Sequence, residues 1–256
     1  MGPIFSKKTD AFFASITDVT RFVGRFFREL VRRPYEGNEI IKQCYEIGVK
    51  ALPLITITSL ITGLVFTKQS RPSLAEFGAT SWLPSLLGIA IIKSLAPLVT
   101  ALISAGKVGS GIGAELGSMR VTEQIDAMDV SGVNAFKYLV VSRVLATSFM
   151  LPMLMMYSAF IGLMGSFWDV QANEQIGMFS FFQHAFEKIS FLDFASSVFR
   201  SIVYGFTISV TACFKGYTTM GGTQGVGKSA NMAVVVSMFL IFIEEMVIIT
   251  MVGWLR

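Results

Sequence analysis

The sequence predicts an all-α, polytopic membrane protein with an N-terminal amphipathic helix at the membrane interface, five transmembrane helices and a charged cytosolic helix. Of its 256 residues, 53% are hydrophobic and 15% are charged, which is too apolar for an ordinary soluble domain. Five apolar runs are each about as long as the ~20 residues that a hydrocarbon core requires. We see no tandem repeat or low-complexity linker, so residues 1–256 are expected to form one domain.

The first predicted element is a basic amphipathic helix over residues 10–33. Asp10 can cap its start and Pro34 ends it. Apolar residues recur every three or four positions, and arginines occupy the other face: Phe12, Phe13, Ile16, Val19, Val23, Phe26, Phe27 and Leu30 against Arg21, Arg25, Arg28 and Arg32. This pattern favours a helix lying in the head-group layer, with a soluble helix packed on a partner as the alternative.

The five predicted spans cover residues 49–66, 83–105, 139–168, 191–214 and 232–255. Basic residues are concentrated in the second and fourth connections, as positively charged cytoplasmic loops require: Lys107, Arg120, Lys137, Arg143, Lys215 and Lys228, against Lys68, Arg71 and Lys188 in the other two. The N-terminus is therefore expected inside and the C-terminus outside. Trp82, Trp168 and Trp254 fall at outer span ends, and residues 177–189 of the outer connection predict a short interfacial helix.

A polar stretch lies between the second and third spans, at residues 104–143. Its glycines allow close backbone approach, and its charges follow at three- to five-residue intervals, as on one exposed helical surface: Glu115, Arg120, Glu123, Asp126 and Asp129. Met119, Ile125 and Met128 add an apolar side. We interpret residues 111–137 as a cytosolic docking segment; the alternative is a solvated segment without a partner.

Charged residues lie well inside the predicted spans at Lys93, Arg200, Glu244 and Glu245. Each costs several kcal/mol in hydrocarbon unless it is paired or hydrated, so they either form buried ion pairs or line a polar cavity. Arg200 is the best candidate for an anionic head group, because its planar guanidinium matches phosphate oxygens and it lies in the outer half of its span.

Several chemistries find no support in the sequence. Cys44, Cys213 and His184 do not form a metal-ligand or redox set, no catalytic constellation is visible, and we expect no cofactor. The asymmetry of basic charge indicates membrane topology rather than nucleic-acid binding. Residues 222–229 satisfy the letters of a Walker A motif, but a span precedes and another follows, so we predict a glycine-rich inner turn instead.

Several segments together resemble the MlaE/YrbE family of permeases, the membrane subunits of ABC transporters that work with MCE proteins. The run Ala114–Met128 (AELGSMRVTEQIDAM) is the most specific. Further similarity lies in a set of shorter matches: Gly63, Val65 and Gln69, Ala96–Leu102, Ala105–Gly109, Arg143 with Leu151-Pro152, Gly216-Tyr217 and Gly225–Ser229. The resemblance covers most of the chain after the N-terminal helix.

This resemblance implies a homodimer in the bacterial inner membrane, with a coupling helix that a separate cytosolic ABC ATPase moves. The other implied partners are a periplasmic MCE-domain protein and often a small STAS-domain protein. The implied cargo is phospholipid or a related lipid, carried between inner and outer membranes. The chain itself would be a transport subunit and not an enzyme. An ion-coupled secondary transporter or channel using Lys93, Glu244 and Glu245 is the alternative.

Matching positions carry the family's roles onto this sequence. Glu115, Arg120, Glu123, Gln124 and Asp126 fall in the coupling region, and Arg200 falls where the family has a basic residue near the lipid pocket. We expect Arg200 and Lys93 to attract the phosphate, and Leu64, Val65 and Phe66 to hold acyl chains. The family commonly has Arg-Glu-Leu-Gly-Pro where this chain has Lys93–Pro97 (KSLAP), so the acidic neighbour is missing.

Overall fold

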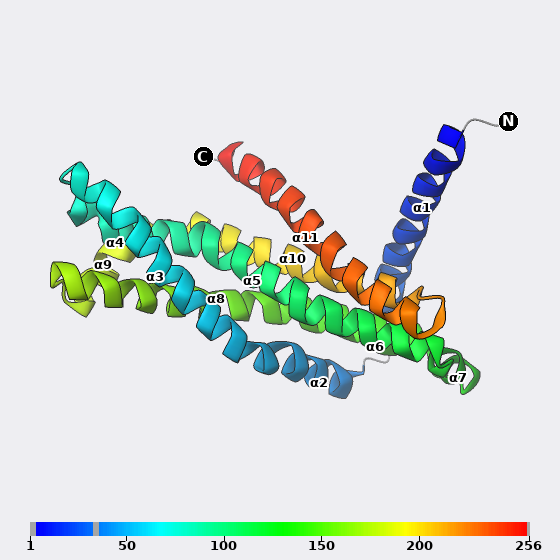
Figure 1. Cartoon of the computed structure of the whole chain (residues 1–256). Coiled ribbons are helices and arrows are strands. Elements are labelled where there is room, and N and C mark those ends of the chain that lie inside the picture. Colours follow the sequence, from blue (N-terminus) through cyan, green and yellow to red (C-terminus); the bar gives the residue numbers. More distant parts are fainter. Residues whose placement is uncertain (1–3, 33–35, 255–256) are drawn as a thin grey trace.

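The computed structural model describes residues 4–32 and 36–254, and within them every regular element is helical (Figure 1). The predicted all-α fold class is confirmed. The α-helices, in chain order, are α1 (Ile4–Val31), α2 (Gly37–Gly48), α3 (Leu52–Glu76), α4 (Leu83–Ala90), α5 (Ala96–Ser104), α6 (Ser110–Val121), α7 (Gln124–Val130), α8 (Ser142–Glu174), α9 (Met178–Glu187), α10 (Phe191–Tyr217) and α11 (Gly222–Trp254).

Short turns of tighter or wider helix join several of these into longer rods. They are the 3₁₀ turns η1 (Val49–Ala51) and η2 (Thr80–Trp82) and the π-helical turns η3 (Ile91–Leu95), η4 (Ala105–Gly109) and η5 (Lys137–Val141). Five of the described rods are long and apolar enough to cross a membrane: Gly37–Glu76, Thr80–Val121, Lys137–Glu174, Phe191–Tyr217 and Gly222–Trp254. These rods contain the predicted runs, apart from residue 255, which lies outside the described residues. They extend past most of the predicted ends, because a helix can continue from apolar into polar sequence.

The long helices run side by side, with α4 and α9 at one end of the bundle and α6 and α7 at the other (Figure 1). The charge pattern predicts that the α4–α9 end lies outside and the α6–α7 end in the cytosol. Helix α9 lies almost where residues 177–189 were predicted to be helical. Its Phe181 and Ala185 are buried, while Phe179 and Phe186 are exposed.

Helix α1 leaves the bundle at the cytosolic end (Figure 1). Phe22 and Phe26 near its C-terminus are buried, and the Phe22 ring meets those of Phe136 and Phe214 edge-on. The amphipathic helix is confirmed, but it begins earlier than residue 10. Asp10 therefore lies within the helix and not at its start, and Pro34 lies outside the described residues.

Spans one and three pack at glycines. A Cβ added to Gly63 of α3 would lie 2.0 Å from the carbonyl oxygen of Gly162 in α8, so only glycine permits this approach. Beside the crossing, the hydroxyls of Ser59 and Ser158 are hydrogen-bonded at 2.7 Å, and Ser166 donates to the Gly63 carbonyl at 3.1 Å. Small residues and hydroxyl bonds are the usual means by which helices associate in a membrane.

The segment predicted as one charged surface is divided between two helices. Helix α6 continues the second span to Val121, and the chain then turns through Glu123, which has a left-handed φ of 58°. Glu115 and Arg120 therefore extend the span, whereas Asp126 and Asp129 belong to the short helix α7. The chain turns here because Ile125 is fully buried under the bundle and pulls α7 against it.

Candidate functional site

Arg200 connects three spans within the membrane. Its side chain is 1% exposed, and its Nη1 donates to Glu245 Oε1 on α11 and to the backbone carbonyl of Lys93 in η3, each at 3.1 Å. Tyr204, one turn further along α10, donates its hydroxyl to the other oxygen of Glu245. One nitrogen of the guanidinium predicted to meet a head group is thus occupied by protein acceptors, whereas its buried Nε has no hydrogen-bond partner among the described residues.

The acceptor on Lys93 exists because of a proline. Pro97 follows Lys93 by four residues and has no N–H, so the Lys93 carbonyl lacks its α-helical donor. The same stretch is wound as the π-turn η3, a feature found frequently at functional sites. Arg200 supplies the missing donor from α10, which fixes the second span to the fourth.

The Lys93 side chain forms a second ion pair. Its Nζ lies 3.1 Å from Asp193 Oδ1, and the lysine side chain is about a quarter exposed. Asp193 also forms a capping box with Ser190 at the start of α10. Asp193 was not among the predicted site residues, although the Ser190-x-x-Asp193 spacing before an apolar run is typical of a capping box. The acidic partner absent next to Lys93 in the sequence is therefore provided by another span.

The adjacent glutamates of α11 have different surroundings. Glu245 points to Arg200 and Tyr204, whereas Glu244 Oε1 accepts a hydrogen bond from Thr207. The other oxygen of Glu244 is buried and has no hydrogen-bond partner among the described residues. The side chains of adjacent helical residues point about 100° apart, which explains why Glu245 forms an ion pair with Arg200 and Glu244 does not.

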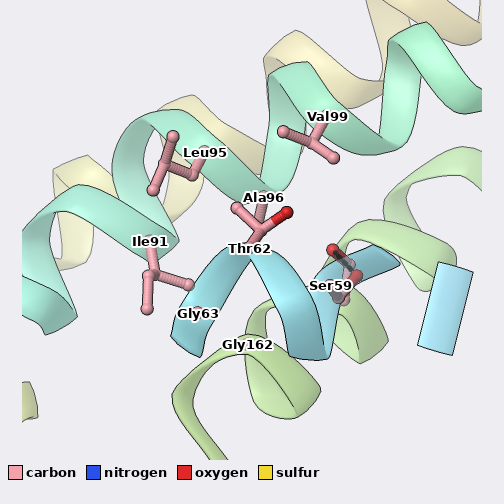
Figure 2. Close-up of a pocket in the computed structure, with 9 residues that line it drawn as sticks. Ser59, Thr62, Gly63, Ile91, Leu95, Ala96, Val99 and Gly162 are labelled. Atoms are coloured by element: carbon pink, nitrogen blue, oxygen red, sulfur yellow. Dashed lines mark hydrogen bonds between the residues drawn. The ribbon is translucent and has the colours of Figure 1, made fainter. Parts of the chain in front are cut away.

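The three predicted acyl-chain residues do not share one surface. Val65 is 53% exposed, Phe66 packs against the apolar cluster around α4 and α8, and Leu64 is half-buried. Thr62 and Gly63 of the same helix face Leu95 and neighbouring residues of the second span across a small crevice (Figure 2). That crevice holds about 10 Å³, room for about one water molecule and not for a lipid.

Two of the five predicted coupling residues form ion pairs with each other, and a third pairs with the third span. Arg120 of α6 pairs with Asp126 of α7. Glu115 lies 2.8 Å from Arg143, a residue of α8 that is 2% exposed. Glu123 and Gln124 at the corner are exposed, as are the apolar side chains of Val130 at the end of α7 and Met220 between α10 and α11. The corner between α6 and α7 therefore exposes charged and apolar side chains, and ion pairs connect this region to the second and third spans.

The stretch with the Walker A letters is not a phosphate loop. Residues 222–229 form the first two turns of α11, and the reversal before them uses the positive φ angles of Gly221 and Gly222. The predicted inner turn therefore lies at the very start of the motif, at Gly221 and Gly222, and the rest of the motif is helical. Ser229 packs into α6, where its hydroxyl is 3.3 Å from the Gly113 carbonyl.

A comparison with known protein families decides what these helices belong to. The family described as "Permease MlaE" matches residues 40–251. The chain belongs to the MlaE permease family. Like the other members, this MlaE-family chain is a multi-pass membrane protein and a permease subunit of an ABC transporter. It is a transport subunit that works with a partner ATPase, as predicted, and not an enzyme.

Individual MlaE-family relatives align along most of the chain. A probable ABC transporter permease protein, slr1045 of Synechocystis, is 34% identical over 222 residues, covering 87% of this chain and 84% of the relative. Another from Rickettsia bellii is 32% identical over 242 residues, 94% and 93% of the two chains. The chloroplastic protein TRIGALACTOSYLDIACYLGLYCEROL 1 of Arabidopsis thaliana is 32% identical over 225 residues, covering 88% of this chain and 64% of its own length.

Proposed function

We propose that this permease moves phospholipid or a related lipid between the inner and outer membranes of a bacterial cell. The observation that carries the proposal is the similarity to a relative whose name refers to trigalactosyldiacylglycerol, a glycerolipid, across 88% of this chain. In this proposal the N-terminus is cytoplasmic and the C-terminus periplasmic. An MCE-domain protein, and in some systems a STAS-domain protein, completes the assembly with the ATPase.

The chamber for the lipid would lie between two copies of the chain. The crevice between the first two spans is far too small for a lipid. The exposed side of α3 carries an apolar row of Ile57, Ile61 and Val65. Helix α11 carries exposed Phe242 and Met246 at similar spacing. A second copy facing these rows would bury them and enclose a hydrophobic cavity, which supports a homodimer.

Lys93 and Arg200 would act at different stages of transport. Lys93 is partly exposed and can attract a phosphate while still close to Asp193. Arg200 is buried and can meet a head group only after its bond to Glu245 opens. We therefore propose that Lys93 attracts the lipid first, and that Arg200 holds spans two, four and five together until the transporter changes conformation.

The ATPase would push on the corner formed by Glu123, Gln124 and Val130. Movement of α7 would reach the second span through the Arg120–Asp126 pair, and the third span through Glu115 and Arg143. These links connect an exposed surface to the membrane helices by charge-assisted contacts. The proposed mechanism is mechanical coupling, with ATP hydrolysed entirely in the partner.

A charge reversal at the corner tests the proposal. Glu123→Lys keeps a non-glycine residue at the left-handed position, so it alters charge more than backbone. In the complex reconstituted with its ATPase, we expect ATP-driven transfer of phospholipid to acceptor vesicles to fall about tenfold or more, as for a lost charged contact. The control, Gln171→Lys at the exposed outer end of α8, should transfer lipid normally.

Two results would contradict the proposal. If the purified complex held no lipid by mass spectrometry and moved none, the cargo would be wrong. If the chain alone, without an ATPase, carried protons or sodium ions and lost that flux with Glu244→Gln, the ion-coupled alternative would replace it.

A further inference from the structure

A second apolar cavity opens near the outer end of the bundle, where α8, η3 and the start of α10 meet below α9. We name it the outer groove. It has a volume of about 380 Å³, and its walls include Ile92, Ala159, Phe160, Leu163, Phe191 and Phe194. Apart from the Ser190 hydroxyl, which already caps α10, its lining is apolar. It is separate from the small crevice between α3 and the second span.

The outer groove faces the membrane and not a protein core. Its walls belong to three of the rods long enough to cross a bilayer, those of the second, third and fourth spans. Phe160 on one side is more than half exposed, and Phe191 on the other is 86% exposed. Because these side chains lie at span level, the medium that reaches the groove is hydrocarbon.

The volume of the groove indicates what kind of group can bind in it. One turn of α-helix with its side chains fills a cylinder about 10 Å wide and 5.4 Å tall, which is ~400 Å³. The groove has room for about one such turn, whereas a membrane helix of a partner subunit would pack along several turns. A linear acyl chain is slender enough to enter, and the volume lies within the range of about 300–1,000 Å³ for ligand pockets.

A positively charged residue is adjacent in sequence to the wall of the outer groove. Lys188 precedes Ile189 of the groove wall, is exposed, and makes no ion pair with any described residue. Its Nζ lies 3.8 Å from the centre of the Trp82 ring, which is itself largely exposed at the outer end of the second span. Tryptophan and snorkelling lysine mark the depth at which lipid phosphates lie. Glu187, the preceding residue, is also exposed and carries a negative charge. Lys188 can therefore attract an anion only at short range.

We propose that the outer groove binds one acyl chain of a glycerophospholipid from the outer leaflet, with the phosphate of that lipid next to Lys188. The apolar walls bind the chain, and the lysine fixes the depth of the head group. The site belongs to a single protomer and lies on a different side of the bundle from the α3 row. It requires neither the dimer chamber nor a particular transport direction.

A photolabelling experiment tests this site. The complete complex is placed in vesicles of phosphatidylethanolamine and phosphatidylglycerol that contain a trace of phosphatidylglycerol with a diazirine on one acyl chain. Labelled peptides are then mapped by mass spectrometry. We expect labels to concentrate on residues 155–163 and 189–194. Ala159→Phe, which places a ring in the groove, should reduce them about tenfold.

The matched control is Met153→Phe, an exposed position on the same helix that does not line the groove. It should leave the labelling unchanged. Lys188→Glu, which leaves the packing of the groove intact, should reduce labelling by the anionic probe several-fold and covers the case in which Ala159→Phe fails to fold. Equal labelling around the whole bundle, or labelling insensitive to both variants, would overturn the proposal. Labels that appear only when the MCE-domain protein is omitted would also overturn it, because that partner would then cover the groove.

Discussion

Arg200 shows how a single buried residue determines a membrane architecture. Its guanidinium donates to a carbonyl that Pro97 leaves without a donor, and it also neutralises the carboxylate of Glu245. In hydrocarbon neither the free carbonyl nor the free carboxylate would be tolerated. Arg200, Glu245 and the Lys93 carbonyl therefore depend on one another. Stability measurements on single and double variants test this dependence.

We expect Arg200→Met and Glu245→Met to destabilise the protein by about 3–5 kcal/mol each, because each leaves one buried charge without its partner. The double variant should recover part of that loss, since no charge is then left buried alone, while the Lys93 carbonyl and the Tyr204 hydroxyl still lack their partners. Thermal unfolding in detergent micelles measures the three values. Lys228→Met, at an exposed position of α11, serves as the control and should change stability little. Losses that simply add in the double variant would show that the pair is not coupled.

At the scale of elements, glycines decide how closely the spans approach. The first and third spans touch at Gly63 and Gly162. Helix α4 meets α9 in the same way at Gly88, where an added Cβ would lie 2.1 Å from the Ala185 carbonyl oxygen. Both contacts are backbone to backbone, so no side-chain rotation can relieve an added methyl group. Neither helix pair could form in this geometry with larger residues.

Gly63→Ala should therefore destabilise the protein by about 1–3 kcal/mol, as overpacking a rigid contact does. The measurement is again thermal unfolding in micelles. Gly227→Ala is the matched control, since nothing lies within 4 Å of its added Cβ in helix α11. That variant should be neutral or slightly more stable because alanine is the better helix former. An equal effect of both substitutions would argue against the close crossing.

At the scale of the whole molecule, the orientation in the membrane follows from the distribution of basic residues. Starting from a variant with Cys44→Ala and Cys213→Ala, we expect Val130→Cys in α7 to react with an impermeant maleimide only after cells are opened. Gln171→Cys at the exposed end of α8 should react in intact spheroplasts. The physical reason is that lysine- and arginine-rich connections stay in the cytoplasm. The reverse pattern would invert the topology and place the coupling corner outside.

The sequence by itself determined the features that depend on local pattern. Span number, the amphipathic α1, the short α9 and the family all follow from hydropathy, periodicity and contiguous motifs, because these properties are written in neighbouring residues. The ends of the spans were less well predicted, since α3 and α6 continue past the apolar stretch into polar residues.

The tertiary structure decided which distant groups meet. Lys93 pairs with Asp193, a hundred residues away, and Glu245 rather than Glu244 meets Arg200. The helical break at Glu123 follows from burial of Ile125, and the separate faces of Leu64, Val65 and Phe66 follow from helix rotation. Each of these outcomes depends on how helices are turned and packed against one another. A rotation of one residue moves a side chain by about 100°, and only packing in three dimensions sets that angle.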